Sequence, residues 1–548
     1  MTAQARPGDD RALRRAAGLL AVAPLVWIAQ AGLLALGIGR IAAGSGAAGV
    51  AWLAVGVLAL GALRAGLDHF GGRLAFRAAR ARLSTLRAEA TARLAAVSPL
   101  DTSRPPSGLA ASVLAEEAEA VTPYLTRFRP ARLKATVVPL AIFAAVLPFS
   151  WVAALALLLS APLIPIFMAL IGWRAQAASA ARLVEAGSLN AFLLDRLRGL
   201  ATIRGLGAVD LTAARLRAEA ERFREGTMAV LRIAFLSSAV LELFAALGVA
   251  MVAVWVGFHL LGTLGFGAWG HRLTLAEGIF VLLLAPAFFE PLRELAAVWH
   301  DRAAGEAAIA ALESLGRDAA ALPAGVTPPA PTAAPAVGVR RLRYRHPGQA
   351  EDAVGPLDLD IGAGEAVAVM GPSGAGKSTL LALLAGLAEP DGGRLLIDGV
   401  ALPAAARRAG IAWLGQSPAI FTGSLARNVT LGRPGIDREA VAEALRFARL
   451  DAVAAARGGA PIGEDGLGLS GGEALRLAIA RAAVTPEARL ILADEPTAHL
   501  DTGTADEITD LLLALGRGRT LIVATHDPRL AARLGRTIPI ASRLEAAA

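Results

Sequence analysis

Residues 371–379 read Gly-Pro-Ser-Gly-Ala-Gly-Lys-Ser-Thr, between the strand-like run AVAVM and the helix-like run TLLALLAGL. This is the G-x-x-x-x-G-K-[ST] pattern, whose glycines allow consecutive backbone N–H groups to wrap a phosphate at a helix N-terminus. Lys377 can reach the β- and γ-phosphate oxygens, and the Ser378 hydroxyl can take one position around Mg²⁺. The flanking strand and helix disfavour a chance glycine-rich turn. The predicted phosphate loop comprises Gly371, Ser373, Gly374, Ala375, Gly376, Lys377, Ser378 and Thr379.

Two adjacent carboxylates, Asp494 and Glu495, end the apolar run RLILAD-E. An aspartate at a strand end can hold Mg²⁺ through water, and the glutamate beside it can activate the attacking water as a general base. Acidic residues at strand ends are common, so this pair alone indicates little. Its position after the segment LSGGE gives it weight.

Residues 469–473 read Leu-Ser-Gly-Gly-Glu and precede ALRLAIARA. With the two motifs above, this segment resembles the signature of the ATP-binding cassette (ABC) family. The resemblance implies that Ser470 and Gly472 contact the γ-phosphate of an ATP held by the phosphate loop of a partner subunit, at a helix N-terminus suited to anions. The signature residues are Ser470, Gly471, Gly472 and Glu473.

The same resemblance assigns three further motifs. Gln416 in AWLGQSP matches the Q-loop, which senses Mg²⁺ and faces the membrane domain, and Asp501 in AHLD matches the D-loop. His526 in VATHD matches the switch histidine that contacts the γ-phosphate, although alone it would be an ordinary histidine at a strand end. The segment GEDG, with Glu464, matches a loop typical of exporters. The implied catalytic residues are Glu495, His526 and Gln416, with Mg²⁺ held by Ser378, Gln416 and Asp494.

Two positions depart from the family pattern. The signature ends in Glu473, where glutamine is commoner. The aromatic residue that stacks on adenine falls at His346, with Tyr344 two residues earlier. Histidine offers a smaller stacking face, so we expect weaker adenine binding unless Tyr344 substitutes for it.

The composition and periodicity of the sequence change along the chain, and they predict which elements position these motifs. Beyond residue 337, short β-branched runs alternate with amphipathic helical runs, which predicts a soluble α/β domain over residues 337–548. Residues 303–336 combine a helical stretch with the Pro-rich LPAGVTPPAPTAAPA, and we interpret them as a semi-rigid linker.

The composition places the remainder in a membrane. Hydrophobic residues make up 55% of the 548 residues, and the mean hydropathy is +0.54, too high for a purely soluble chain. Basic residues cluster beside apolar runs, the positive-inside pattern of membrane proteins, so the net charge of +8 does not indicate a nucleic-acid partner. With no cysteine, the chain has no disulfide and no thiol nucleophile.

Apolar stretches predict six membrane spans. The first should remain as an anchor, because it is too long for a signal-peptide core and has no obvious cleavage site. They cover residues 18–43, 46–63, 135–149, 151–173, 234–261 and 276–299, the third being short and containing Pro139. Residues 1–16 form a cytoplasmic N-terminal segment, and residues 17–302 a transmembrane domain.

Two of the segments that connect the predicted spans are long. Residues 64–134 and 174–233 are rich in Arg, Ala and Glu with helical periodicity, so we expect helices that continue well beyond the membrane on the cytoplasmic side. Residues 107–117 and 198–207 are candidate coupling helices that transmit closure of the ATP-binding domains, with ordinary helix corners as the alternative.

Six spans followed by one cassette resemble an ABC half-exporter, which works as a dimer. The segments APLIPIFMALIGW, FLLDRLRGLATIRGLG and LLLAPAFFEPLRELAAVWHDRAAG further resemble CydD-type subunits of the CydDC thiol-reductant exporter family, over most of the chain from about residue 130. This resemblance implies a heterodimer with a CydC-like partner in the bacterial inner membrane. It also implies ATP-driven export of cysteine or glutathione, with haem as a competing cargo, and a requirement for cytochrome bd assembly.

The sequence indicates the cargo-binding residues less firmly than it indicates the ATP-binding residues. Arg64 and Arg232, near span ends, could meet the carboxylates of glutathione or could be interface anchors. Haem would require an axial ligand such as His69, His259 or His271. Glu242 lies inside the fifth span, where we expect an interhelical polar contact or a cavity-lining carboxylate, and cargo binding is the third option.

Three other functions compete with this interpretation. A half-exporter of lipids, drugs or peptides would share every motif of the cassette. Soluble ABC proteins of DNA repair or translation are excluded by the six spans and the single cassette. A non-hydrolysing regulatory channel is disfavoured by Glu495.

Overall fold

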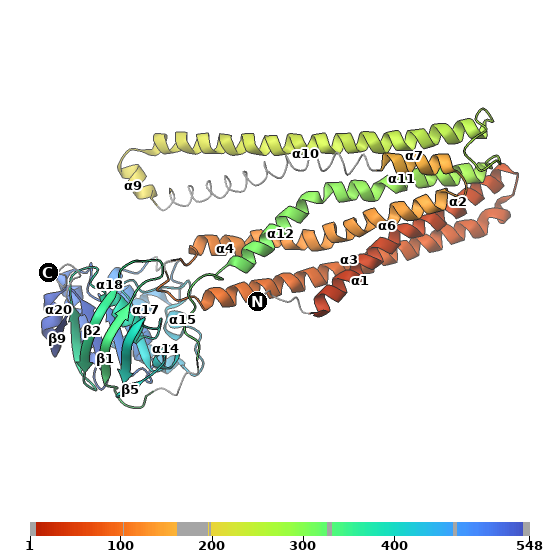
Figure 1. The fold of residues 1–548 in the computed structure, drawn as a ribbon. Helices are drawn as coiled ribbons and strands as arrows, with labels where there is room; N and C mark the ends of the chain where they lie inside the picture. The colour runs from red at the N-terminus through yellow and green to blue at the C-terminus, as the bar shows by residue number, and fades with distance from the viewer. Residues whose placement is uncertain are drawn as a thin grey trace. The chain divides into compact units, whose positions relative to one another are not determined.

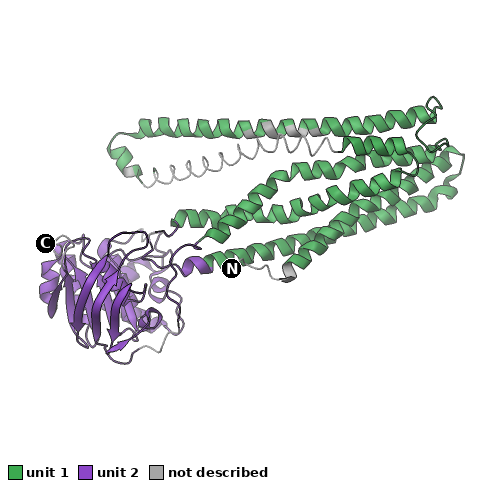
Figure 2. Ribbon diagram, in the orientation of Figure 1, with its two compact units in different colours: residues 1–91, 106–315 green, residues 92–105, 316–548 purple. Residues whose placement is uncertain are grey.

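The computed structural model describes residues 7–101, 103–161, 196, 199–325, 331–463 and 468–540. The chain divides into two compact units, which are described separately. Unit 1 contains Met1–Thr91 and Pro106–Leu315, and unit 2 contains Ala92–Pro105 and Gly316–Ala548 (Figure 2). Glu464, Arg198, most of residues 174–198 and the second half of the predicted fourth span lie outside the described residues.

Unit 1 is helical. Its main helices are α1 (Pro7–Val22), α2 (Val26–Ala42), α3 (Ala47–Ala95), α4 (Ser107–Ala115), α5 (Val121–Pro123), α6 (Arg129–Val146), α7 (Trp151–Ser160), α9 (Leu200–Gly205), α10 (Val209–Leu260), α11 (Leu275–Ala297) and α12 (Trp299–Ser314). Short 3₁₀ turns (Ala23–Leu25 and Glu117–Ala120) and a π-helical turn (Tyr124–Phe128) join several of them.

The two long helices confirm the prediction of helical extensions beyond the spans. Helix α3 has 49 residues and α10 has 52 (Figure 1). At a rise of about 1.5 Å per residue, each is more than twice as long as the roughly 30 Å hydrocarbon core of a bilayer. The candidate coupling segments coincide with the short helices α4 and α9.

Four helical stretches among the described residues are long and apolar enough to cross a membrane: Asp10–Ala42, Ala47–Ala95, Glu242–Leu260 and Leu275–Ser314. They contain all but one residue of each of the predicted first and second spans, most of the fifth and all of the sixth. The predicted third span falls on α6, which begins at Arg129 and carries Arg132 and Lys134 in its first turns. The predicted fourth span begins as α7.

Helix α11 is the centre of unit 1, where it packs against α2, α6 and α10 (Figure 1). Its Phe288 and Phe289 are buried, and their rings meet edge to face at 5.1 Å. Helix α10 approaches α11 at Gly248, where an added Cβ would lie 2.9 Å from Phe289 Cε2 and 3.2 Å from Ser160 Oγ. The absence of a side chain at Gly248 therefore sets the spacing of these two helices.

Unit 2 is an α/β domain with two sheets. Strands β6 (Ile411–Leu414), β7 (Leu490–Asp494), β8 (Thr520–Thr525), β3 (Ala366–Met370) and β9 (Arg536–Pro539) form a parallel sheet in that order. Strands β2 (Val354–Ile361), β1 (Val337–Tyr344), β4 (Gly392–Ile397) and β5 (Val400–Ala401) form an antiparallel sheet.

The helices of unit 2 are α13 (Lys377–Leu384), α14 (Ala404–Arg407), α15 (Leu425–Thr430), α16 (Arg438–Phe447), α17 (Asp451–Arg457), α18 (Gly471–Ala483), α19 (Thr502–Leu515) and α20 (Pro528–Arg533). Every residue of β7 and β8 is buried, as expected for central parallel strands. Parallel strands end at a common edge, so the residues after β3, β6, β7 and β8 are brought together.

The segment Ala92–Pro105, which follows from α3, belongs to unit 2. Val97 pairs with Ala321 in an isolated β-bridge, and the Ser98 hydroxyl donates to the Leu387 carbonyl at 2.7 Å. Asp101 accepts from the Ala320 amide, and hydrogen bonds, first with Ser103, lower its pKa. The segment is therefore anchored by backbone and side-chain bonds.

We expect Gly248→Ala and Gly257→Ala to have opposite effects on stability. Both glycines lie in α10, and an added Cβ at Gly257 meets nothing within 4 Å. Gly257→Ala should stabilise by about 0.5–1 kcal/mol through helix propensity. Gly248→Ala should destabilise by about 1–3 kcal/mol, because the buried Phe289 ring cannot move aside. Thermal unfolding of the detergent-solubilised protein measures both, and equal shifts would contradict the proposed close contact.

Candidate functional site

The glycine-rich loop connects β3 to α13, and its backbone requires glycine. Gly374 and Gly376 have φ of 83° and 88°, in the left-handed region that side chains rarely adopt. An added Cβ at Gly376 would overlap the Ala353 carbonyl oxygen, and one at Gly371 would lie 2.6 Å from the Ile540 carbonyl oxygen. The loop thus holds bare backbone at the N-terminus of α13, which suits an anion such as phosphate.

Lys377 and Glu495 form the buried centre of the site. The Lys377 ammonium lies 2.8 Å from the Gly371 carbonyl oxygen, 3.1 Å from that of Pro372 and 3.3 Å from Glu495 Oε1. The side chains are 6% and 12% exposed, so this ion pair is nearly removed from water. All three N–H groups of the ammonium have partners.

His526 completes a chain of three side chains. It follows β8, and its Nδ1 lies 2.6 Å from Glu495 Oε2. An ionised carboxylate only accepts hydrogen bonds, so Nδ1 carries the proton of this contact. Glu495 has φ of 47°, a left-handed conformation that turns the chain sharply after β7. Glu495 therefore contacts donors from the phosphate loop and from the residue that follows β8.

Asp494 and Ser378 face each other across the same edge. The Ser378 hydroxyl donates to Asp494 Oδ1 at 3.0 Å. Burial raises the pKa of Asp494, an effect that the hydrogen bond from Ser378 opposes and the neighbouring charge of Glu495 reinforces. Gln416 is exposed and follows β6, which pairs with β7 up to Ala493. Hydroxyl, carboxylate and amide oxygens are ligands that Mg²⁺ prefers.

The two predicted adenine residues, Tyr344 and His346, differ in burial. Tyr344 is 6% exposed and packs within the hydrophobic core, with its ring edge toward His346 at 5.3 Å, so it has no open face for a base. The His346 Nδ1 lies 3.2 Å from the Leu100 carbonyl oxygen, and its Nε2 lies 3.3 Å from Thr379 Oγ1. The carbonyl requires a proton on Nδ1, so neutral His346 accepts from Thr379 through Nε2.

The signature residues begin α18 with a capping box. The Ser470 hydroxyl accepts from the Glu473 amide at 3.3 Å, and Glu473 Oε2 accepts from the Ser470 amide at 2.7 Å. Glutamate and glutamine both serve at this position of a capping box, which accounts for Glu473 in place of the commoner residue. Among hydrogen bonds of the described residues, none joins the signature to the phosphate loop of the same chain.

Thr504, which sequence reasoning missed, connects the signature to the predicted D-loop. Asp501 caps α19 by accepting from the Thr504 amide at 3.0 Å and from its hydroxyl at 2.6 Å, and the hydroxyl bond lowers the pKa of Asp501. An added Cβ at Gly472 would lie 2.6 Å from Thr504 Cγ2. Gly472 therefore permits α18 to approach α19 at this threonine.

Comparison with known proteins identifies the family. Residues 16–283 match the ABC transporter transmembrane region, and residues 354–498 match the ABC transporter family. The chain is 37% identical over 481 residues to the transport ATP-binding protein AarD of Providencia stuartii, covering 85% of this chain and 80% of that protein. This chain belongs to the ABC exporter family. It has a membrane domain and an ATP-binding domain, and it couples ATP hydrolysis to transport.

Other relatives carry more specific names. The glutathione/L-cysteine transport system ATP-binding/permease protein CydD of Escherichia coli is 36% identical over 430 residues, 77% of this chain and 72% of that protein. The glutathione/L-cysteine transport system ATP-binding/permease protein CydC of Bacillus subtilis is 32% identical over 409 residues, 74% of this chain and 70% of that protein. A solved bacterial Atm1-family ABC exporter with ATP bound has the same fold, with a TM-score of 0.78, 23% identity and coverage of 97% and 96%.

The predicted transport residues of this exporter occupy different environments. Glu242, on α10, pairs with Arg293 of α11 at 3.1 Å, which is the interhelical polar contact expected from its position. Arg232 is exposed on α10. Arg64, on α3, lines a cavity of about 610 Å³ in unit 1.

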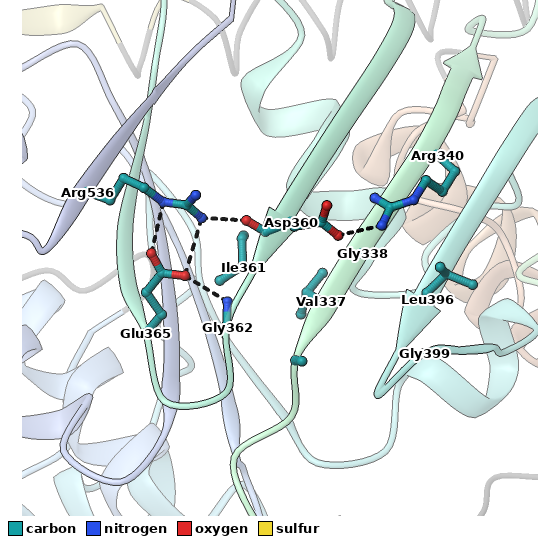
Figure 3. Close-up of a pocket in the computed structure, with 11 residues that line it drawn as sticks. Val337, Gly338, Arg340, Asp360, Ile361, Gly362, Glu365, Leu396, Gly399 and Arg536 are labelled. Atoms are coloured by element: carbon teal, nitrogen blue, oxygen red, sulfur yellow. Dashed lines mark hydrogen bonds and ion pairs between the residues drawn. The ribbon is translucent and has the colours of Figure 1, made fainter.

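A second hollow, of about 410 Å³, lies in unit 2 along β1 and β2 (Figure 3). Its cations are already paired: Arg536 meets Glu365 at 2.8 Å, and Arg340 meets Asp360 at 2.7 Å. These pairs leave little charge for a ligand, so we assign this hollow no function.

Asp494→Asn should separate stability from activity. Burial raises the pKa of Asp494 in the folded protein, so its ionised form destabilises the fold. This destabilisation is absent below the ordinary pKa of an aspartate, grows between that value and the raised pKa of the folded state, and is complete above it. At neutral pH we expect an equal or higher melting temperature without ligand. We expect ATPase activity to fall by about 10²-fold or more, because a charge at the phosphates is lost.

The matched control is Asp506→Asn, which changes an exposed carboxylate on α19. It should alter neither property. A lower melting temperature at neutral pH in Asp494→Asn would contradict the argument from burial.

Proposed function

We propose that this exporter is one half of a heterodimer that exports small thiols, cysteine or glutathione, across the bacterial inner membrane. The observation that carries the proposal is 36–37% identity over 72–74% of the length of proteins named as CydD glutathione/L-cysteine transporters. Matches to proteins named CydC support a CydC-like partner. The resemblance to this family extends the proposal to supporting cytochrome bd assembly, with the ATP-binding domain and both termini in the cytoplasm.

Each ATP would be held by residues of both subunits. The phosphate loop, Lys377 and Thr379 would bind the phosphates, and the His346 ring would stack on adenine. The signature of the partner would close over the γ-phosphate, as Ser470 and Gly472 would do for the partner's ATP. The lack of a described hydrogen bond between the signature and phosphate loop of one chain supports this arrangement.

The oxygen ligands at the strand edge fit a hard divalent cation. Ser378 and Asp494, whose oxygens lie 3.0 Å apart, with Gln416 beside them, would hold Mg²⁺. Bound there, the ion neutralises negative charge on the phosphates. The glycines of the loop, where a Cβ would overlap backbone oxygens, leave the N–H groups open to the same phosphates.

Glu495 would act as the general base. Lys377 and His526 hold its two oxygens at 3.3 Å and 2.6 Å, which orients the carboxylate. A phosphate would compete with Glu495 for the Lys377 ammonium, and release of Oε1 would free a carboxylate oxygen to polarise the attacking water. His526 would keep the other oxygen in position while Nε2 reaches toward the γ-phosphate.

The test is ATP turnover by the heterodimer reconstituted in lipid nanodiscs. Glu495→Gln keeps the size and hydrogen bonding of the side chain but removes its basicity. We expect turnover at this site to fall by about 10²- to 10⁴-fold, with ATP binding retained. Glu443→Gln, which changes an exposed residue of α16, is the control and should turn over ATP normally.

Undiminished turnover in Glu495→Gln has two explanations, which a second variant separates. If the corresponding substitution in the partner abolishes turnover, the partner's site carries the hydrolysis. If it does not, Glu495 is not the general base.

The cargo assignment is tested with the same preparation. Cysteine or glutathione should stimulate ATP turnover and should accumulate inside inverted vesicles in an ATP-dependent manner. Stimulation only by haem, lipids or drugs would remove the thiol assignment and leave the exporter assignment intact.

A further inference from the structure

The cavity in unit 1 combines charged and apolar walls. It lies among the start of α2, α3, α6 and α11. Its volume of about 610 Å³ is within the range of roughly 300–1,000 Å³ that is typical of small-molecule sites. Trp27, Leu282, Leu283 and Val138 contribute apolar surface, and six charged residues line the same space: Arg64, Asp68, Lys134, Glu290, Arg293 and Glu294.

Three of the six charges are already neutralised by an ion pair. The Lys134 ammonium lies 3.1 Å from one oxygen of Glu294 and 3.2 Å from the other. Arg293 meets both oxygens of Glu242, at 3.1 and 3.2 Å. These pairs join α6 to α11 and α10 to α11, so they also fix the walls of the cavity.

Arg64, Asp68 and Glu290 differ from these pairs. Arg64 and Asp68 are one helical turn apart on α3, a spacing that permits an ion pair, yet among the described residues neither has an ion-pair partner, nor does Glu290 on α11. Arg64 is only partly exposed, and it sits where the apolar part of α3 ends. Asp68 and Glu290 are exposed, so their carboxylates are open to a ligand, and a carboxylate from outside the chain would stabilise the half-buried Arg64 guanidinium.

Two prolines add uncharged acceptors to the same wall. Pro286 and Pro291 lie inside α11 and have no N–H, so the carbonyls of Leu282 and Ala287 lose their usual helical donors. All four residues line the cavity. A carbonyl without its helical donor can accept from an ammonium group.

We infer that this cavity binds the ammonium and carboxylate groups of an amino acid or short peptide. Arg64 receives the carboxylate, since its guanidinium can donate two parallel hydrogen bonds. Asp68, Glu290 and the freed carbonyls receive the ammonium, and the apolar wall around Trp27 contacts the side chain. The inference rests on the proposed function, because cysteine and glutathione both carry these two groups, and it locates their site.

The same lining disfavours the competing cargoes. Among the described lining residues there is no His, Cys or Met to ligate haem iron. His69, His259 and His271 lie elsewhere, and His259 is buried with its ring stacked on Trp255 at 4.9 Å. A lipid chain would leave Arg64, Asp68 and Glu290 desolvated without partners.

Equilibrium binding to the full heterodimer in nanodiscs tests the site. The probes are radiolabelled cysteine and glutathione, with serine and S-methylglutathione as counterparts that lack a thiol. Arg64→Gln, Asp68→Asn and Glu290→Gln should each weaken cysteine binding by about 10- to 100-fold. Arg73→Gln, the same substitution on an exposed residue of α3 outside the cavity, is the matched control and should bind like the wild type.

Ligands that lack one group assign each contact. Cysteine ethyl ester has no carboxylate, so Arg64→Gln should bind it as the wild type does. N-acetylcysteine has no ammonium, so Asp68→Asn and Glu290→Gln should not weaken its binding. A variant that merely disturbs the fold would lose all of these ligands alike, and that result would overturn the inference.

The two proposals fail in different ways. Thiol transport with unchanged affinity in all three variants would overturn the site and leave thiol export standing. Binding of serine and S-methylglutathione that depends on Arg64, without transport of any thiol, would retain the site and remove thiol export. A wild-type complex that binds none of the four probes would overturn the site.

Discussion

The ion pair between Lys377 and Glu495 is the interaction on which the nucleotide site depends. Two charges of opposite sign lie 3.3 Å apart with side chains only 6% and 12% exposed. Removing one partner from such a pair leaves a buried charge uncompensated, at a cost of about 3–5 kcal/mol. The pair connects the phosphate loop after β3 to the end of β7, and His526 extends the connection to β8. The backbone of Glu495, at φ of 47°, carries strain of about 1–3 kcal/mol that places its carboxylate between the two donors.

In unit 1, ion pairs also join neighbouring elements, but some of its charged residues have no such partner among the described residues. Lys134 with Glu294 and Glu242 with Arg293 are paired within the unit, and both pairs hold α11 to its neighbours. Arg64, Asp68 and Glu290 line one cavity, and in the part of the chain that the structure describes they have no ion-pair partner. Charge pairing therefore separates residues that hold helices together from residues available to a ligand. Sequence alone grouped Arg64, Arg232 and Glu242 as one set, and the structure gives each a different environment.

Much of the nucleotide site could be predicted because it depends on local rules. Gly374 and Gly376 have left-handed backbone conformations that favour glycine, and Asp494, Gln416 and His526 each end or follow a strand of one parallel sheet. Their meeting at one edge follows from the topology. The two long helices were also predictable from charge and periodicity. The start of the third span was less predictable, because its helix begins at Arg129, before the apolar run, and includes Arg132 and Lys134.

Other contacts leave no trace in the sequence. The Leu100 carbonyl that holds His346 lies 246 residues away and belongs to the backbone, so no side-chain pattern marks it. Thr504 beside Gly472 and the meeting of Asp68 with Glu290 in one cavity likewise depend on how elements pack, which helical periodicity does not specify.

Helix α3 connects the two sites through one stretch of chain. Arg64 lies on α3, the helix runs without interruption to Ala95, and Leu100 follows five residues later. At the far end, Ser98 and Asp101 anchor the chain to unit 2, so the Leu100 carbonyl is held against His346 by bonds independent of the histidine. Arg64, which we assign to the cargo carboxylate, and Leu100, whose carbonyl contacts the histidine that we assign to the nucleotide base, thus lie on a single helix and its short continuation.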